Sequence, residues 1–213
     1  MVEEKVFIPS TESYEFLKED LGTLTYVNKN NQLFLLFAQK LYQVDIETGT
    51  SEVLEEGIKQ NHFVVSDTKA HAAWLITSGD DQGKIREIEF DSLKTRDLSP
   101  ENGQKLRVLG FMNEDLVYGI LSDADILTDA NGHETEGLST FRIESFKGKV
   151  KKEYHQDGLY ITNVTVGSTM MEFELSAKSG NAYAVQKKDN IMNNKKASGS
   201  QVDVALITTN RAG

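Results

Sequence analysis

The sequence predicts an all-β protein built from about four antiparallel sheets of four strands each. The first reason is a series of runs, roughly four to eight residues long, that are rich in Val, Ile, Leu, Phe and Tyr and bounded by Asn, Asp, Gly or Ser. The second is composition, since 16 glycines among many short β-rich runs argue against a helical protein. The third is a hairpin pattern that recurs along the chain.

The expected elements begin with a short helical segment at residues 13–22, which ends at Gly22. The strands that follow are apolar runs separated by polar turns. They are expected at residues 24–28, 32–38, 40–46, 62–66, 72–77, 84–90, 116–121, 139–145, 160–166 and 182–186.

The repeating unit is a hairpin followed by a strand with an acidic end and then a short polar strand. Its turn markers are Asn28, Asp67, Asn113 and Gly167, so one unit takes about 40 to 50 residues. A four-stranded unit of this length is typical of one blade of a β-propeller, which buries its faces only by stacking on its neighbours. The blades are expected at about residues 23–57, 62–99, 106–154 and 159–189 of a single domain.

The C-terminal run at residues 201–209, QVDVALITT, predicts one more strand after a polar linker. Two interpretations stay open for this strand. It either closes the ring by adding to the first sheet, or it starts a further blade, in which case the chain is part of a larger propeller.

Two stretches resemble the blades of known propeller repeat proteins. LYQVDIETG, at residues 41–49, resembles the strand ending of TolB-like, WD-like and quinoprotein-type blades. FVVSDTKAHAAWL, at residues 63–75, resembles the TolB-like hairpin WSPDGKxIAF at Ser66, Asp67 and Lys69. It departs from that pattern in lacking the Pro and in having Thr68 where Gly is usual. The resemblance implies an architecture and no particular activity.

The composition excludes several classes of function. With a net charge of −10, the chain should repel phosphate backbones and anionic membrane surfaces, so neither nucleic acid nor a membrane is an expected partner. The absence of cysteine excludes disulfides, thiolate zinc sites and Cys nucleophiles. We expect a soluble chain that inserts in no membrane. Its own residues leave open whether it is the extracytoplasmic part of an exported or membrane-anchored protein.

Two acidic loops are the candidate ligand or partner face. Each joins the second to the third strand of a repeat, at residues 78–83 and 122–137, and in a propeller such loops share one face. The candidate residues are Asp80, Asp81, Asp123, Asp125, Asp129, Glu134 and Glu136. The alternative is a solvated hairpin, whose tip is the turn-forming Asn131-Gly132.

A calcium site is a further hypothesis for the second loop. The EF-hand pattern is excluded, because with Gly132 at its sixth position Leu127 and Leu138 would be the first and last ligands. An irregular calcium site would use the remaining carboxylates, Asp123, Asp125, Asp129 and Glu134. Apart from calcium, no cofactor is expected. The histidines, His62, His71, His133 and His155, show no metal-binding spacing.

No catalytic motif is present: the sequence has no GxSxG elbow, P-loop or GxGxxG. The sequence therefore favours a non-catalytic scaffold that binds a protein or a ligand on the acidic loops. One alternative is an enzyme, or an enzyme's accessory domain, that binds a small substrate at the propeller channel. Another is a structural segment of a larger surface protein.

Overall fold

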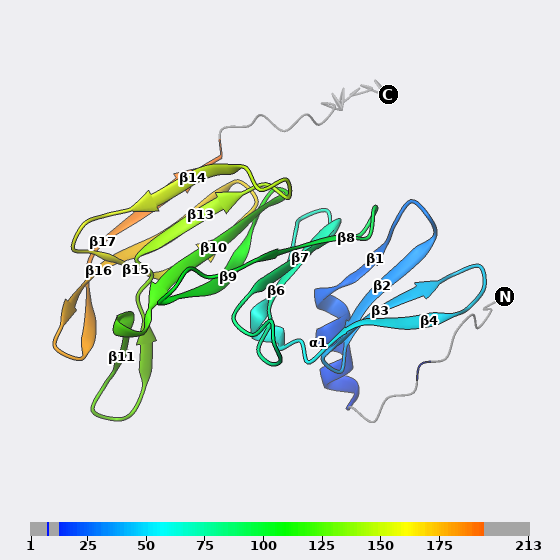
Figure 1. Cartoon of the computed structure of the whole chain (residues 1–213), viewed down its shortest axis with the longest axis horizontal. Helices are drawn as coiled ribbons and strands as arrows, with labels where there is room; N and C mark the ends of the chain where they lie inside the picture. The colour runs from blue at the N-terminus through cyan, green and yellow to red at the C-terminus, as the bar shows by residue number, and fades with distance from the viewer. Residues whose placement is uncertain (1–7, 9–12, 194–213) are drawn as a thin grey trace, which may run out of the picture.

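The computed structural model describes residue 8 and residues 13–193, and it is almost entirely β (Figure 1). Within the described part of the chain, one α-helix precedes the strands, as predicted, and two short 3-10 helices interrupt them. No helix of the described residues is long and apolar enough to cross a membrane. The elements are α1 (Tyr14–Thr23), β1 (Thr25–Val27), β2 (Gln32–Phe37), β3 (Lys40–Asp45), β4 (Ser51–Glu56), η1 (Gln60–His62), β5 (Phe63–Val65), β6 (His71–Leu75), β7 (Ile85–Glu89), β8 (Lys94–Leu98), β9 (Gln104–Met112), β10 (Asp115–Ser122), η2 (Asp123–Asp125), β11 (Ile126–Thr128), β12 (Glu134–Glu136), β13 (Thr140–Glu144), β14 (Val150–His155), β15 (Tyr160–Val166), β16 (Met170–Ser179) and β17 (Ala182–Met192).

The strands form successive antiparallel sheets, which confirms the predicted propeller-like architecture. Over residues 13–193, three sheets have four strands each, in the orders β1-β2-β3-β4, β5-β6-β7-β8 and β9-β10-β13-β14. We call these the first, second and third sheets. The fourth sheet, β15-β16-β17, has three strands among the described residues. The expected strand at residues 201–209 lies outside the described residues.

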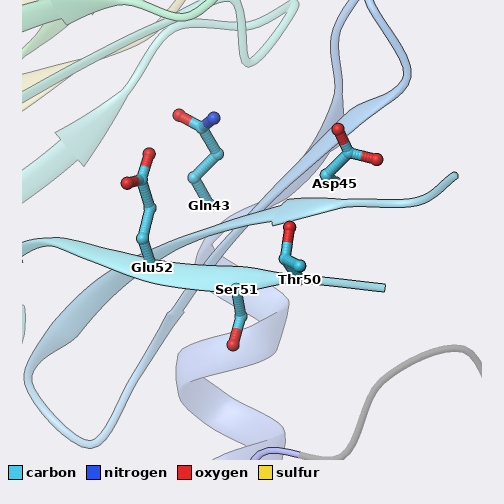
Figure 2. Close-up of a pocket in the computed structure, with 5 residues that line it drawn as sticks. All are labelled: Gln43, Asp45, Thr50, Ser51 and Glu52. Carbon is cyan, nitrogen blue, oxygen red and sulfur yellow. The ribbon is translucent and has the colours of Figure 1, made fainter. Parts of the chain in front are cut away.

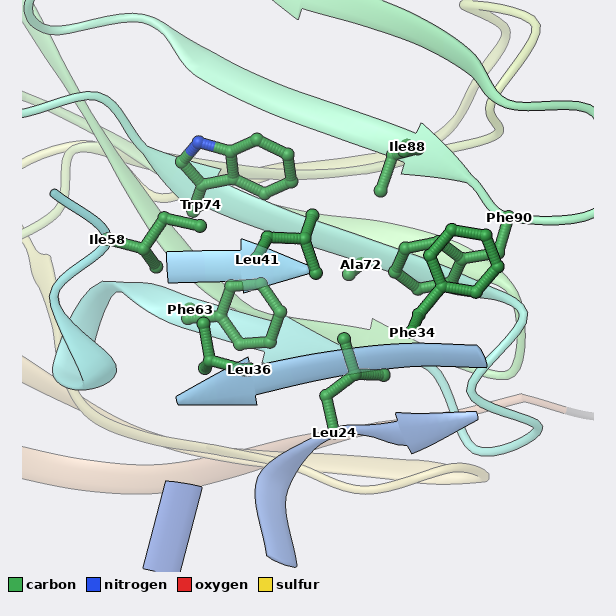
Figure 3. Packing of buried hydrophobic residues seen from close by; sticks show 10 residues of the cluster. All are labelled: Leu24, Phe34, Leu36, Leu41, Ile58, Phe63, Ala72, Trp74, Ile88 and Phe90. Carbon is green, nitrogen blue, oxygen red and sulfur yellow. The ribbon is translucent and has the colours of Figure 1, made fainter. Parts of the chain in front are cut away.

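The sheets stack face to face along the chain and do not close into a ring over the described residues (Figure 1). The alternation of side chains along each strand gives every inner sheet two apolar faces. The first and second sheets meet around Phe34, Trp74 and Phe90, and the Phe34 and Phe90 ring centroids are 4.5 Å apart (Figure 3). This stacking explains why the most apolar predicted runs lie in the middle strands.

The other two junctions are built in the same way. Between the second and third sheets, Ala73 and Leu75 of β6 pack against a cluster that includes Leu106, Leu116 and Ile120. Between the third and fourth sheets, the ring of Phe173 lies 5.3 Å from Phe141 and 5.0 Å from Tyr154, measured between ring centroids. Each sheet is therefore stabilised chiefly by its neighbours, because one sheet cannot bury both of its faces alone.

Candidate ligand-binding pocket at the loop end

The two acidic loops join the second strand to the third strand of the second and third sheets. The first loop connects β6 to β7, and the second connects β10 to β13 and contains η2 and the small β11–β12 hairpin. Most of their predicted site residues are engaged by the protein itself. Asp81 accepts a hydrogen bond from Lys84 at 2.6 Å and lies 3.5 Å from Arg86, whereas Asp80 is exposed.

Asp125 fastens the second loop to the fourth sheet. One of its carboxylate oxygens accepts hydrogen bonds from the Ser122 hydroxyl (2.7 Å) and backbone N–H (3.0 Å), and the other accepts one from Lys178 at 2.8 Å. Tyr183 donates to the backbone oxygen of Asp125 at 2.9 Å. Burial by itself would raise the pKa of Asp125, but the hydrogen bonds from Lys178 and Ser122 outweigh it and hold that pKa below its usual range.

The tip of the second loop is a turn organised by Asp129. Its carboxylate accepts hydrogen bonds from the backbone N–H groups of His133 (2.9 Å) and Asn131 (2.7 Å), which lower its pKa in that order of importance. Glu134 follows on an exposed position of β12. Asp129 therefore shapes the hairpin tip, whereas Glu134 is directed to solvent.

The structure does not bring together the four carboxylates of the hypothetical calcium site. Asp125 faces the fourth sheet, Asp129 holds the tip, and Asp123 forms an ion pair with Lys105 at 2.5 Å. No group of three or more His, Asp or Glu among the described residues is arranged to hold a metal ion. The calcium site stays a prediction that the arrangement of these side chains does not support.

A pocket of about 440 Å³ lies where the first loop meets the start of β9. Its apolar lining comes from Leu75, Ile76, Pro100 and Leu106. Gln82 and Gly83 of the first loop contribute to its wall. Its charged lining consists only of cations, Lys59, Lys105 and Arg107, so in an acidic protein this pocket is basic. We call it the loop-end pocket.

The second loop holds two of these cations in place. The guanidinium of Arg107 binds Glu136 through Nε (2.7 Å) and Nη2, and donates from Nη1 to the Leu106 carbonyl oxygen at 2.8 Å. Lys105 pairs with Asp123. The side chain of Lys59, just before η1, is in no ion pair among the described residues. Both acidic loops therefore contribute to this pocket. The first loop forms part of its wall, and the second loop binds two of its cations through Asp123 and Glu136.

The pKa of His62, a residue next to the pocket, is affected by the charges of this region. Its pKa is lowered by burial first, and then by the positive charges of Arg107 and Lys59, while Glu136 opposes the shift. Its Nδ1 is buried and has no hydrogen-bond partner among the described residues. His62 is therefore neutral at pH 7, beside groups that are positively charged.

Two smaller pockets differ in chemistry. One, of about 270 Å³, lies at the β3–β4 hairpin and is lined by polar and acidic groups: Gln43, Asp45, Thr50, Ser51 and Glu52 (Figure 2). Asp45 there accepts hydrogen bonds from the backbone of Glu47 and Thr48, both at 2.9 Å, so its carboxylate stabilises the turn. The other, of about 280 Å³, lies between β8 and the third sheet. Its lining includes residues of a buried charged cluster.

The buried charged cluster joins the second and third sheets through Arg96, Glu87, Glu144 and Tyr118. Arg96 donates to Glu87 at 2.6 Å and to Glu144 at 2.5 Å, and Tyr118 donates to Glu144 at 2.8 Å. Glu87 is fully buried, and burial raises its pKa to about 7 against the opposing effect of Arg96. His71 lies beside this cluster, with Nδ1 3.8 Å from the second oxygen of Glu87.

Reasoning from the sequence predicted the acidic loops but missed the cations of the loop-end pocket. Lys105 and Arg107 alternate with Gln104 and Leu106 at the start of β9. That alternation was the available signal, because every second residue of a strand points to the same side. Lys59 carries no comparable signal, since it lies in a connection between two sheets.

No family model matches the sequence, and no curated protein matches it. Solved structures that resemble the chain include the tricorn protease (15% identity over 73% of this chain and 19% of that chain, TM-score 0.41). Another is an oligogalacturonate lyase from Vibrio parahaemolyticus (10% identity, 79% and 51% coverage, TM-score 0.41), and a third is the WD40 repeats of RRP9 (10% identity, 76% and 50% coverage, TM-score 0.39). The chain spans about half or less of the length of each of these proteins. These similarities say nothing about activity or partners.

Proposed function

We propose that this chain is a non-catalytic binding module that holds a small ligand or a short peptide segment in the loop-end pocket. The supporting observation is that apolar residues and three cations together line one pocket of about 440 Å³. Pockets of a few hundred Å³ that combine apolar walls with a few fixed polar groups are typical of ligand sites.

The charged groups of this pocket are suited to binding rather than to proton transfer. Lysine and arginine side chains stay protonated near neutral pH, so they attract an anion without exchanging a proton. The exposed acids of the two loops, Asp80 and Glu134, would repel other anionic surfaces that approach the loops. In this proposal, the acidic loops contribute to selectivity, and the basic pocket between them provides the contact.

The proposal is tested by adding a fragment library to the ¹⁵N-labelled chain and mapping the amide shifts by NMR. We expect binding fragments to shift amides of Leu75, Ile76 and Leu106. Gln82→Trp, which places a bulky ring at the wall of the pocket, should abolish these shifts. Gln186→Trp, on an exposed position of β17, is the matched control and should retain them. A library without any hit at the pocket, or chemical conversion of a bound fragment, would contradict the proposal.

A further inference from the structure

The balance of charge at the loop-end pocket differs from that of the whole chain. The chain carries a net charge of −10, yet the charged lining of the pocket is entirely positive. Two carboxylates, Asp123 and Glu136, offset two of the three cations from outside the lining. One positive charge is left over, on Lys59, so the pocket can accept one more anion.

The three cations are available to different degrees. Arg107 is fixed, because all three of its guanidinium nitrogens donate hydrogen bonds within the protein. Lys105 is exchangeable, since its partner Asp123 has a side chain that is 83% exposed and an ion pair of that kind contributes little stability. Lys59 is exposed and in no ion pair among the described residues. Lys59 and Lys105 are therefore the groups that can contact a ligand, whereas Arg107 adds a fixed positive charge.

The one positive charge left over in the pocket, on Lys59, matches a carboxylate, which carries a single negative charge, better than a phosphate group, which carries nearly two at pH 7. Both cations of β9 hold carboxylates, Lys105 that of Asp123 and Arg107 that of Glu136. A ligand carboxylate could replace Asp123 on Lys105 while also reaching Lys59. Ile76 and Pro100, which are the partly exposed apolar residues of the lining, would then cover an apolar group attached to that carboxylate, whereas Leu75 and Leu106 are buried in the core beneath them.

We infer that the loop-end pocket selects ligands in which a carboxylate is attached to an apolar stem, with Lys59 and Lys105 as its contacts. This inference rests on the proposed function, because it names the ligand class of the same pocket. Burial is the main cause of the lowered pKa of His62. The positive charges of Arg107 and Lys59 lower it further against the opposing negative charge of Glu136, which agrees with a positive potential at this point. Neutral His62 also places no further charge beside the ligand.

Matched probes test this inference on the full chain. Titrations followed by NMR compare hexanoate with hexanamide, which has the same stem but no charge, and with hexyl phosphate. We expect hexanoate to bind about tenfold more tightly than hexanamide, as a charged hydrogen bond contributes more than a neutral one. This advantage should shrink in 0.5 M NaCl. Lys59→Gln and Lys105→Gln should each reduce it, and the double variant should abolish it.

The matched control is Lys147→Gln, an exposed lysine in the β13–β14 turn, which should keep the full advantage. Equal binding of hexanoate and hexanamide would overturn the inference and leave the proposed binding function standing. Tighter binding of hexyl phosphate would overturn the assignment of a carboxylate. Failure of all three probes, together with an empty fragment screen, would overturn both proposals.

Discussion

Arg96 is shared by two carboxylates at the junction of the second and third sheets. Glu87 comes from β7 and Glu144 from β13, so this one guanidinium links two sheets. One cation cannot fully compensate two buried carboxylates, because removing charges from water costs more than a single pairing returns. Burial therefore raises the pKa of Glu87 to about 7, so its carboxyl titrates close to neutral pH.

The raised pKa of Glu87 makes stability depend on pH. In the unfolded chain this group titrates near 4.5, so between that pH and about 7 the folded state binds more protons. Its contribution is complete below pH 4.5 and is lost as the pH rises through 7. Glu87→Gln cannot ionise, so relative to the parent chain the variant should gain up to about 3 kcal/mol of unfolding free energy by pH 8. Urea unfolding at several pH values measures this difference.

Glu52→Gln is the control for this experiment, because it removes the same charge at an exposed position of β4. The difference between the two variants isolates the effect of burial. If Glu87→Gln and Glu52→Gln follow the same dependence on pH, the ionisation of Glu87 does not determine the stability of this junction.

The second acidic loop belongs to the third sheet, but residues of the fourth sheet also hold it in place. Lys178 of β16 reaches both the Ala124 carbonyl oxygen and the Asp125 carboxylate, at 2.8 Å each. Leu138, at the end of the loop, exchanges backbone hydrogen bonds with Ile161 of β15, at 2.8 and 3.0 Å. The loop is thus a bridge between two sheets, and its base should be more ordered than its tip.

Asp125→Ala should release the base of this loop. The variant loses the hydrogen bonds to Ser122 and the ion pair with Lys178, and it leaves the Lys178 ammonium without its carboxylate partner. We expect amide hydrogen exchange over residues 122–126 to rise at least tenfold, with little change in the strands of the first sheet. Asp129→Ala should affect only the tip, around residues 129–133. Equal protection of the base in Asp125→Ala and the parent would contradict this assignment.

At the scale of the whole molecule, the three interfaces between sheets form a continuous series. Trp74, the only tryptophan, lies between the first and second sheets, and Phe173 lies between the third and fourth. The buried charged cluster and the apolar contacts of the middle junction connect these two regions. The four sheets should therefore unfold as one cooperative unit, although repeat arrays can also unfold in parts.

Phe173→Ala tests this coupling from a distance. Deleting a large buried aromatic side chain typically costs about 3 to 5 kcal/mol. If the sheets unfold together, the midpoint reported by Trp74 fluorescence should fall by the same amount as the midpoint reported by far-UV circular dichroism. Met192→Ala, at a position of β17 that is 65% exposed, should leave both nearly unchanged. Separation of the two midpoints in Phe173→Ala would show that the first two sheets unfold independently.

The local pattern of the sequence accounts for much of the fold. Short apolar runs separated by turn residues predicted strands, and the recurring hairpin predicted four-stranded units, because both depend on residues that are close in the chain. The same pattern could not distinguish paired from unpaired acids. The sequence pattern predicted that Asp125 and Glu136 are surface charges. In the structure Asp125 binds Lys178, 53 residues later in the chain, and Glu136 binds Arg107, 29 residues earlier.

The class of fold, the antiparallel hairpins and the positions of the two acidic loops follow from local periodicity and turn chemistry, so they could be predicted from the sequence. That the two loops meet at a basic pocket depends on tertiary packing. Lys59 lies in the connection between the first and second sheets, whereas Lys105 and Arg107 lie on β9 of the third sheet. They meet because the second and third sheets stack with their loop ends side by side. The charge of a site depends on which residues come together in space. In this protein the stacking of the sheets brings these residues together, and no local sequence pattern encodes that stacking.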